Sequence, residues 1–117
     1  MTNRQWRQFV INHIPRARHY VGIPTGGVVI AMAAVVNYDA EYSLVNDGEL
    51  KGSKPGRGYD WILIDDVATT GNSLLKALFL IETPPREIFV VVDRRKDKSK
   101  LNISSLFQVQ HVRTRGR

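Results

Sequence analysis

Two adjacent carboxylates are the residues of this sequence that most clearly point to chemistry. Asp65 and Asp66 directly follow the apolar run 61–64, which is too short for a helix and is typical of a buried parallel strand. An open α/β sheet binds its ligands beyond the carboxyl ends of its strands, so we expect the pair at a ligand site. Carboxylates there can accept hydrogen bonds from the vicinal hydroxyl groups of a sugar, and such charge-assisted bonds are strong.

The turn that follows has the composition of a phosphate-binding site. Its backbone N–H groups and hydroxyls would lie at the start of a helix over 74–81, and a helix N-terminus attracts anions. The residues concerned are Val67, Ala68, Thr69, Thr70, Gly71, Asn72 and Ser73. Ordinary turn and cap residues would explain one or two of them, but not the whole run. The stretch therefore predicts a receptor for a sugar phosphate.

Bulk composition limits the class of protein. A chain of 117 residues with 43% hydrophobic and 24% charged content is typical of a soluble globular protein, so we treat 1–117 as a single domain. The absence of cysteine excludes disulfides and thiolate chemistry and fits a reducing, cytoplasmic location. The longest apolar run, 28–36, is about half of a membrane span, and the N-terminus lacks a secretory signal. We expect no membrane association.

The formal net charge of +6 indicates an anionic partner. Nucleic acid is one candidate and a polyphosphate ligand is another. Much of the charge lies in one patch, which contains Arg94, Arg95, Lys96, Lys98 and Lys100. Because the patch lacks a repeated aromatic and basic pattern, nucleic-acid binding is not favoured, and a solvated basic surface is the simpler explanation.

Strands and helices alternate along the chain. The expected helices span 3–13, 28–36 and 74–81, and the expected strands span 20–23, 41–45, 61–64, 87–92 and 107–112, with a brief helix or turn at 100–106. Such alternation implies right-handed βαβ units. The sequence thus predicts an α/β fold in three layers, with a mainly parallel sheet of four to five strands and helices on both faces.

Three of the expected strands end in unusual loops. Pro24, Thr25, Gly26 and Gly27 follow the first strand, the acidic pair and its turn follow the third, and residues 93–96 follow the fourth. In a doubly wound sheet these loops open on the same edge and can converge on one ligand. The two glycines would let the main chain approach an anion closely, although any tight turn could use them.

The three loops together resemble the type I phosphoribosyltransferases. ILIDDVATTGNSL is similar to the signature for phosphoribosylpyrophosphate (PRPP), VGIPTGG to the pyrophosphate loop, and VVVDR to the strand end that offers an arginine to the base carboxylate in orotate phosphoribosyltransferases. The resemblance covers most of residues 20–95. It implies the type I phosphoribosyltransferase core with a reduced N-terminal hood, since only about twenty residues precede the first strand. Trp6, Arg7 or Phe9 could serve as that hood, or simply belong to a small helix.

The resemblance also implies an activity and roles for residues. The family transfers ribose 5-phosphate from PRPP to a nucleobase, here orotate or a similar pyrimidine, releases pyrophosphate and depends on Mg²⁺. By resemblance, Asp65 and Asp66 would hold the ribose hydroxyls, and the metal largely through these hydroxyls and water. The turn 67–73 would hold the 5-phosphate, residues 24–27 the pyrophosphate, and Arg94 the base. A homodimer is expected.

The loop 46–60 departs from the orotate pattern. Its length and glycine content suit a flexible lid, with a short hairpin as its one regular structure, and its cations are Lys51, Lys54 and Arg57. The orotate family has an Arg-Lys pair where this chain has Asn46 and Asp47, and Lys51 alone lies near the place of the catalytic lysine. Lys51 therefore joins the acidic pair as a catalytic candidate. A solvated connection between two strands remains the alternative for this loop.

A second function follows from the same departures. The chain could be a non-catalytic PRPP- or nucleotide-binding regulatory module, with RNA bound by its basic surface. Two other site types are disfavoured. His13, His19 and His111 show no zinc-ligand spacing, and the chain contains no GxxxxGK[ST] motif of a nucleotidase.

Overall fold

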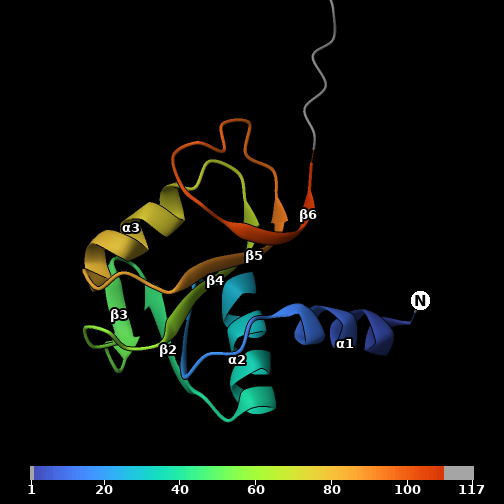
Figure 1. Cartoon of the computed structure of the whole chain (residues 1–117), viewed down its shortest axis with the longest axis horizontal. Coiled ribbons are helices and arrows are strands. Elements are labelled where there is room, and N and C mark those ends of the chain that lie inside the picture. The colour runs from blue at the N-terminus through green and yellow to red at the C-terminus, as the bar shows by residue number, and fades with distance from the viewer. Residues whose placement is uncertain (1, 110–117) are drawn as a thin grey trace, which may run out of the picture.

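One six-stranded sheet forms the centre of the molecule, with the order β3-β2-β1-β4-β5-β6 (Figure 1). The computed structural model describes residues 2–109. The strands are β1 (His19–Gly22), β2 (Glu41–Asn46), β3 (Glu49–Gly52), β4 (Trp61–Ala68), β5 (Glu87–Asp93) and β6 (Ser104–Gln108). Neighbouring strands are parallel except β2 and β3, which form an antiparallel hairpin.

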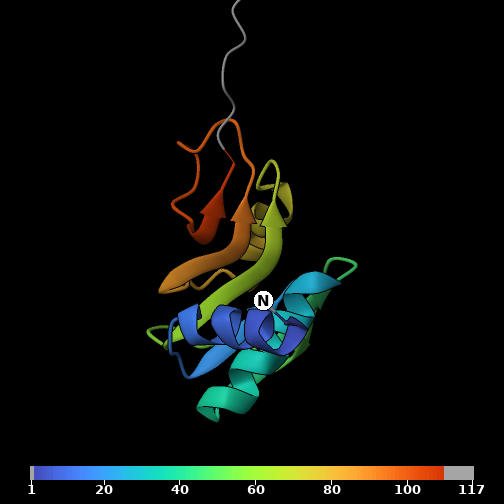
Figure 2. The same ribbon diagram turned by 90° about the vertical axis from the view of Figure 1, so that its right-hand side faces the viewer.

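Helices cover both faces of the sheet, which confirms the predicted three-layer α/β fold. The helices α1 (Asn3–His13) and α2 (Gly26–Tyr38) lie on one face, and α3 (Asn72–Ile81) lies on the other (Figure 2). Each face has its own hydrophobic core. Val10 of α1 and Ala31 of α2 share one core, whereas Leu74 of α3 belongs to the other.

The central strand β4 sets the position of the acidic pair. The four apolar residues at its start have no exposed surface, and burial of such a side chain contributes about 1.5–3 kcal/mol. Ile62 and Ile64 pack with α1 and α2, whereas Leu63 packs with α3. Because successive side chains alternate between faces, this register directs Asp65 toward the α3 side and Asp66 toward the α2 side.

The β2–β3 hairpin adds a strand to the predicted sheet. Residues 49–52 pair with residues 43–46 of β2, so the sheet has six strands among the described residues rather than four or five. Asp47 and Gly48 connect the two strands with φ values of 52° and 73°. Positive φ at both central residues is the requirement of the tightest hairpin turn, for which Asp-Gly is a favoured sequence.

The C-terminal part of the chain differs from the sequence prediction. The residues at 100–106 do not form a helix: after a bend, β6 begins at Ser104 and runs parallel to β5. The predicted strand 107–112 is therefore placed a few residues too late, and its part beyond 109 lies outside the described residues. Ser104 is exposed because β6 is an edge strand with one open side, whereas the Ser105 hydroxyl is buried without a hydrogen-bond partner.

The helix α2 is apolar on all sides and contains no charged residue. Ala31 and Ala34 are buried against the sheet, but Val29 and Val36 are 66% and 80% exposed. The opposite side of α2 thus presents apolar side chains to solvent. None of the helices within residues 2–109 combines the length and the apolar content needed to cross a membrane.

A buried histidine connects the amino-terminal ends of β1 and β2. The His19 side chain is 1% exposed, and its Nε2 lies 2.6 Å from Ser43 Oγ. The Ser43 hydroxyl donates its own proton to the carbonyl of Ser53, so Nε2–H must be the donor to Oγ. The pKa of His19 lies below its ordinary value because burial outweighs the opposing effect of Glu41 nearby.

Candidate functional site

The first and third predicted loops lie in direct contact at the carboxyl edge of the sheet. A Cβ atom added at Gly26 would lie 2.0 Å from Asp66 Oδ2, and one added at Gly27 would lie 2.6 Å from the carbonyl oxygen of Ile64. Residues 26–27 can therefore pass β4 this closely only because they have no side chain. The structure brings the predicted pyrophosphate loop and the acidic pair into one site.

The acidic pair lies inside β4 rather than after its end, which corrects the predicted boundary. The reason is β5, which extends to Asp93 and pairs with Asp65, Val67 and Ala68 of β4. On the other side, β1 pairs no further than Ile64. The segment 65–68 thus has a strand on one side and the glycine loop on the other, where a ligand can approach.

The two carboxylates have different surroundings. Asp65 is 8% exposed and its Oδ1 accepts a hydrogen bond of 2.8 Å from the Asp66 backbone N–H. Burial, followed by the hydrogen bond with the Asp66 side chain, raises the pKa of Asp65 to about 7. Asp66 is half-buried and accepts a bond from the Val67 N–H. One carboxyl of the pair can therefore carry a proton near neutral pH while its neighbour faces the loop.

The predicted phosphate turn encloses a small hollow of about 30 Å³. Its lining consists of Asp65, Val67, Ala68, Thr69, Thr70, Gly71, Asn72, Ser73 and Leu74. Gly71 adopts a φ of 87°, as expected for the tight approach to an anion. Neither Gly71 before α3 nor Thr25 before α2 caps its helix with a side chain, whereas Thr2 and Gln5 form a capping box at α1. The Asn72 N–H donates to Thr70 Oγ1 at 3.3 Å; the other N–H groups at both helix starts can be offered to a ligand oxygen.

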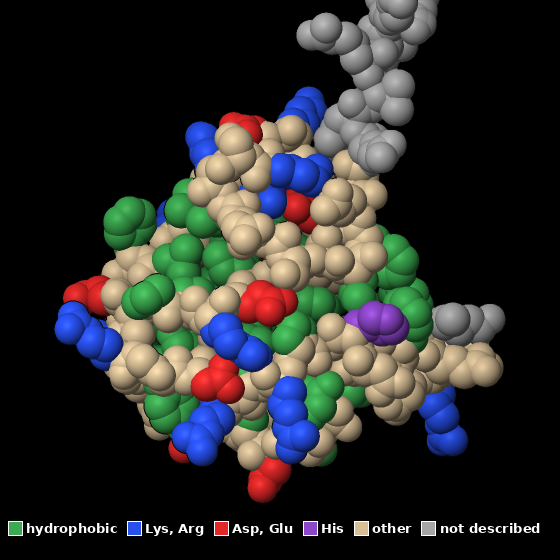
Figure 3. Space-filling model, in the orientation of Figure 1, with side chains coloured by type: hydrophobic (Ala, Val, Ile, Leu, Met, Phe, Trp, Pro, Cys, Tyr) green, Lys and Arg blue, Asp and Glu red, His purple; other side chains and the backbone are tan. Residues whose placement is uncertain are grey.

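A larger, basic hollow of about 620 Å³ adjoins the phosphate turn. It is lined by Thr69, Thr70, Asn72, Arg94, Arg95, Lys96, Asp97 and Lys100. Lysine and arginine side chains gather over the segment between β5 and β6, at the top of Figure 3. The Arg94 N–H donates to the Ala68 carbonyl at 2.7 Å, which fixes the third loop beside the turn. Arg94, the predicted base contact, therefore lies in a hollow shared with the turn.

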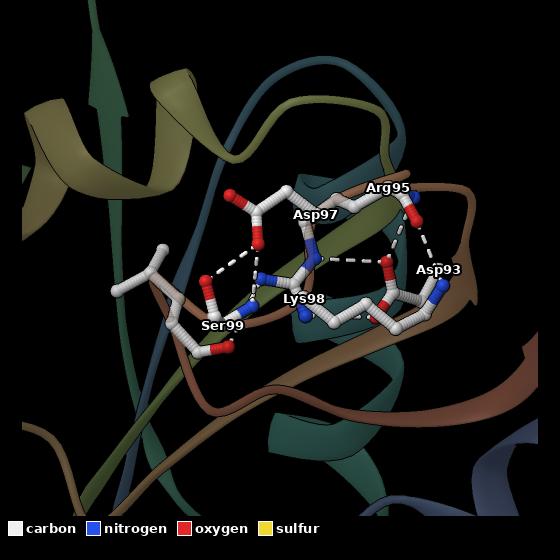
Figure 4. Close-up of polar contacts among 6 residues, drawn as sticks. Asp93, Arg95, Asp97, Lys98 and Ser99 are labelled. Atoms are coloured by element: carbon white, nitrogen blue, oxygen red, sulfur yellow. Dashed lines mark hydrogen bonds and ion pairs between the residues drawn. The ribbon is translucent and has the colours of Figure 1, made fainter.

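Arg95 has a structural position that the sequence did not reveal. It is 3% exposed and forms a bidentate pair with Asp93, with Nε–Oδ1 and Nη2–Oδ2 distances of 2.9 Å (Figure 4). Its Nη1 also donates to the carbonyl of Leu101. The guanidinium holds the pKa of Asp93 below its usual range. Within the predicted basic patch, Arg95 is thus a buried anchor, and no sequence feature distinguishes it from its neighbours.

The predicted lid is largely at the wrong end of the sheet. Only the turn 46–48 lies at the carboxyl edge; β3 then runs antiparallel to β2 and carries the chain to the opposite edge. There the Arg18 N–H donates to the Asp60 carbonyl, ahead of β4. Lys54 and Arg57, in the connection 53–60, therefore cannot act as lid cations above the site.

Lys51 lies level with the carboxyl end of β1, but on the outermost strand of the sheet. It lies on the edge strand β3 and pairs in register with Leu44, which in turn is level with Gly22 at the end of β1. Its Nζ is 3.1 Å from Glu49 Oε2, in an exposed ion pair. β2 and β1 separate β3 from β4. The structure therefore does not bring Lys51 into contact with the acidic pair.

A third hollow, of about 300 Å³, lies between α1 and α2. Trp6 and Arg7, two of the suggested hood residues, line it together with Asp66 and mainly apolar side chains. Phe9, the third, stacks on Trp6 with a centroid distance of 5.9 Å, and Trp6 also stacks on Phe107 of β6. The sequence did not predict this hollow, because it depends on how α1 crosses the sheet.

No three histidine or carboxylate side chains within the described part of the chain lie close enough together to hold a metal ion by themselves. The acidic pair offers oxygen ligands of the kind that Mg²⁺ prefers. That ion commonly uses one or two carboxylates and completes its shell with water and substrate phosphates. Asp65 and Asp66 therefore fit a metal held jointly with a ligand.

A sequence comparison finds a relative among the orotate phosphoribosyltransferases. The chain is 31% identical over 94 residues to the orotate phosphoribosyltransferase of Thermoplasma volcanium, an alignment that covers 73% of this chain and 57% of the relative. The chain thus spans little more than half the length of this curated relative. No protein-family model matches the sequence.

Structural comparisons agree with the sequence comparison on the fold. The crystal structure of orotate phosphoribosyltransferase from Aeropyrum pernix superposes with a TM-score of 0.76 at 20% identity, covering 91% of this chain and 72% of the other. The Mycobacterium tuberculosis orotate phosphoribosyltransferase in complex with PRPP has a TM-score of 0.62 at 20% identity, covering 91% and 70%. The predicted resemblance to the type I phosphoribosyltransferases is confirmed. The sheet and helices of the chain are arranged as in these orotate phosphoribosyltransferase structures.

Proposed function

Because the chain belongs to the type I phosphoribosyltransferase family, we propose that it transfers ribose 5-phosphate from PRPP to a nucleobase, orotate or a similar pyrimidine, and releases pyrophosphate. One observation carries the proposal. The glycine loop lies against the acidic pair, and the phosphate turn begins directly after that pair on β4. PRPP bound there would have its ribose, its 5-phosphate and its pyrophosphate beside three different backbone segments.

The proposed reaction displaces pyrophosphate from C1 of the ribose. The lone pair of a ring nitrogen forms the new bond to C1, the electrons of the C1–O bond leave with pyrophosphate, and the ring N–H proton passes to water. Asp65 and Asp66 orient the ribose through its vicinal hydroxyls. The N–H groups at the start of α3 hold the 5-phosphate. Those of residues 25–27 donate hydrogen bonds to the pyrophosphate oxygens, on which negative charge develops. Positioning and electrostatic stabilisation then supply most of the catalysis.

We propose Mg²⁺ as the cofactor, held by Asp65 and Asp66 together with ribose hydroxyls, water and phosphate oxygens. When bound, the ion neutralises charge on pyrophosphate. We also expect two copies to associate, because the exposed side of α2 is apolar and uncharged.

The decisive experiment measures pyrophosphate release from PRPP in the presence of Mg²⁺ and each of a panel of nucleobases. Release with orotate, abolished in an Asp65→Asn/Asp66→Asn variant that remains folded, is the expected result. A protein that binds PRPP but releases no pyrophosphate with any base would refute the enzymatic proposal.

Binding without turnover is the second candidate, and the β2–β3 hairpin favours it. The last residue of β2 and the two-residue turn after it, residues 46–48 at the carboxyl edge, contain no lysine or arginine, and Lys51 is paired with Glu49. A regulatory module would bind PRPP or a nucleotide without needing those cations. Tight nucleotide binding by calorimetry with no turnover, together with salt-dependent RNA affinity, would identify it.

A further inference from the structure

An aromatic cluster joins α1 to β6, and it remains partly exposed. The rings of Trp6, Phe9 and Phe107 have centroids 5.7–6.3 Å apart, and their planes lie within 26° of one another. The ribbon views show α1 and β6 side by side (Figures 1 and 2). Although they are in contact, Trp6 and Phe107 are 42% and 40% exposed. Nearly parallel rings of this kind leave part of their faces open, and a further flat ring can stack on them.

The helix α1 carries two arginines and no carboxylate. Arg4 and Arg7 lie on either side of Trp6 in the sequence, and both side chains are exposed. Within residues 2–109, neither guanidinium has a hydrogen-bond or ion-pair partner. The sequence contains no carboxylate before Asp39. An anion that reaches this part of the surface therefore meets two available cations beside the exposed rings.

The sequence around the cluster has the composition of a nucleic-acid surface. Basic and aromatic residues alternate in the stretch 4–9, a pattern that the basic segment 94–100 lacks. The segment 110–117, which lies outside the described residues, follows β6 in the sequence and contains three arginines and no carboxylate. Cations combined with exposed aromatic rings are typical of surfaces that bind single-stranded nucleic acid, because the cations meet the phosphates and the rings meet the bases.

The apolar side of α1 is occupied by the core. Val10 of the helix and Ile14 just after it are buried in the core that α1 shares with α2. A helix that binds a membrane surface inserts its apolar side between the lipids, and here that side is not available, which disfavours a membrane as the partner. The capping box of Thr2 and Gln5 fixes the start of the helix. The arginines and rings are therefore presented by an ordered element, which lowers the entropy cost of binding.

We propose that Arg4, Trp6, Arg7 and Phe107 form a binding surface for single-stranded nucleic acid, the aromatic–arginine surface. A base stacks on the exposed rings, and the phosphates next to it pair with the two guanidinium groups. Every base has a flat face and neither contact uses the 2′-hydroxyl, so the surface accepts RNA and DNA strands of different sequence. A duplex keeps its bases stacked on one another and can use only the arginines. The surface shares no residue with the glycine loop, the acidic pair or the phosphate turn, and the inference does not rest on the proposed transfer reaction.

The test measures the fluorescence anisotropy of labelled oligouridine and oligothymidine of about 12 nucleotides, a length within the site sizes of about 4–16 of single-strand-binding domains, and of a duplex of the same length. The whole chain should bind both single strands with dissociation constants within about three-fold of each other, and the duplex at least about 10-fold more weakly. Trp6→Ala/Phe107→Ala should weaken binding of the single strands about 10- to 100-fold through lost stacking, and Trp6→Tyr/Phe107→Tyr should keep most of the affinity. Arg4→Ala/Arg7→Ala, which removes no packing, should reduce the slope of log K against log salt concentration by about 1.4, since each phosphate contributes about 0.7.

Two controls match these variants. Phe79→Ala removes a side chain that is 81% exposed on α3, on the other face of the sheet, and Lys96→Ala/Lys100→Ala removes two exposed charges from the basic segment. Neither should change the affinity for single strands more than about three-fold, because charges beyond a Debye length are largely screened. An equal or larger loss in either control would refute the assignment, as would a duplex bound as tightly as the single strands. Binding to phosphatidylserine vesicles that depends on Trp6 and Phe107, without affinity for the oligonucleotides, would identify a membrane partner and overturn the inference.

Discussion

Alanine at Gly26 should damage the site more than it damages the fold. Its Cβ would lie 2.0 Å from Asp66 Oδ2 and 2.3 Å from Asp66 Cγ, where contact normally needs about 3.5 Å. The Asp66 side chain must therefore move by roughly 1.5 Å. A displacement of about 1 Å can cost on the order of 100-fold in a positioned site. We expect PRPP affinity to fall about 10- to 100-fold.

The effect on stability should be smaller than at Gly27, because the shortest clashes are with the Asp66 carboxyl group, which can rotate; the contact of 2.8 Å with Asp66 Cβ requires an additional small backbone shift. Alanine is better than glycine in a helix by up to about 1 kcal/mol, and Gly26 is the first residue of α2. Repacking around an added methyl costs about 1–3 kcal/mol. The free energy of unfolding, measured by urea denaturation, should therefore change by less than about 2 kcal/mol.

Two further glycines serve as controls. At Gly27 the added Cβ would meet the Ile64 carbonyl oxygen at 2.6 Å and Asp65 Cα at 2.9 Å, which are backbone atoms that cannot rotate away. Gly27→Ala should therefore lose more than about 2 kcal/mol of stability. Gly56→Ala, with no atom within 4 Å, should keep both stability and affinity. A Gly26→Ala protein that binds PRPP as the wild type does would refute this account of the glycine loop.

Three other predictions concern the rest of the molecule. Arg95→Met leaves Asp93 buried without its partner and should lower the free energy of unfolding by about 3–5 kcal/mol in urea denaturation, and Asp93→Asn in the same chain should recover part of it. The pKa of His19 is lowered in the folded state, so below its ordinary value of 6.5 the unfolded chain binds more protons and His19 lowers the stability as the pH drops from 7 toward 5. Asp65, whose pKa is raised to about 7, has the opposite effect in this range, so the quantity to measure by urea denaturation is the difference between the wild type and His19→Gln: the wild type should lose stability relative to the variant as the pH falls. Lys54→Ala/Arg57→Ala should leave pyrophosphate release unchanged, since both cations lie at the far edge; a large loss would restore the lid hypothesis.

The parts of the fold that could be predicted from the sequence are those that local pattern decides. The strand β4 and the helix α3 follow from an apolar run, a glycine turn and a periodic segment, and the helix α1 has the predicted bounds. The bounds of β4 were less predictable, because Asp65 and Asp66 remain in the strand through pairing with β5. That pairing depends on a segment more than twenty residues away.

In the candidate site too, some features could be predicted from the sequence, whereas others depend on how distant segments are arranged. The meeting of the glycine loop with the acidic pair follows from the rule that parallel strands open on one edge, and the short contacts at Gly26 and Gly27 agree with it. The lid was misplaced because composition shows that a segment lacks regular structure without showing its direction. A single Asp-Gly turn reverses the chain at residue 47 and takes the next thirteen residues to the opposite edge. Likewise, Arg95 and Lys96 look equivalent in sequence, but one is buried and the other exposed.

The distribution of cations around the edge bears directly on turnover. The phosphate turn has Arg94, Lys96 and Lys100 beside it, whereas the turn of the β2–β3 hairpin contributes no cation. Under the proposed function, binding of PRPP would use mainly the turn, its helix N-terminus and the acidic pair. Departure of pyrophosphate needs positive charge on the opposite side, where the chain offers backbone N–H groups. Turnover should therefore depend on added Mg²⁺ far more steeply than binding of the 5-phosphate does, and a second copy that supplies a cation would reduce that dependence.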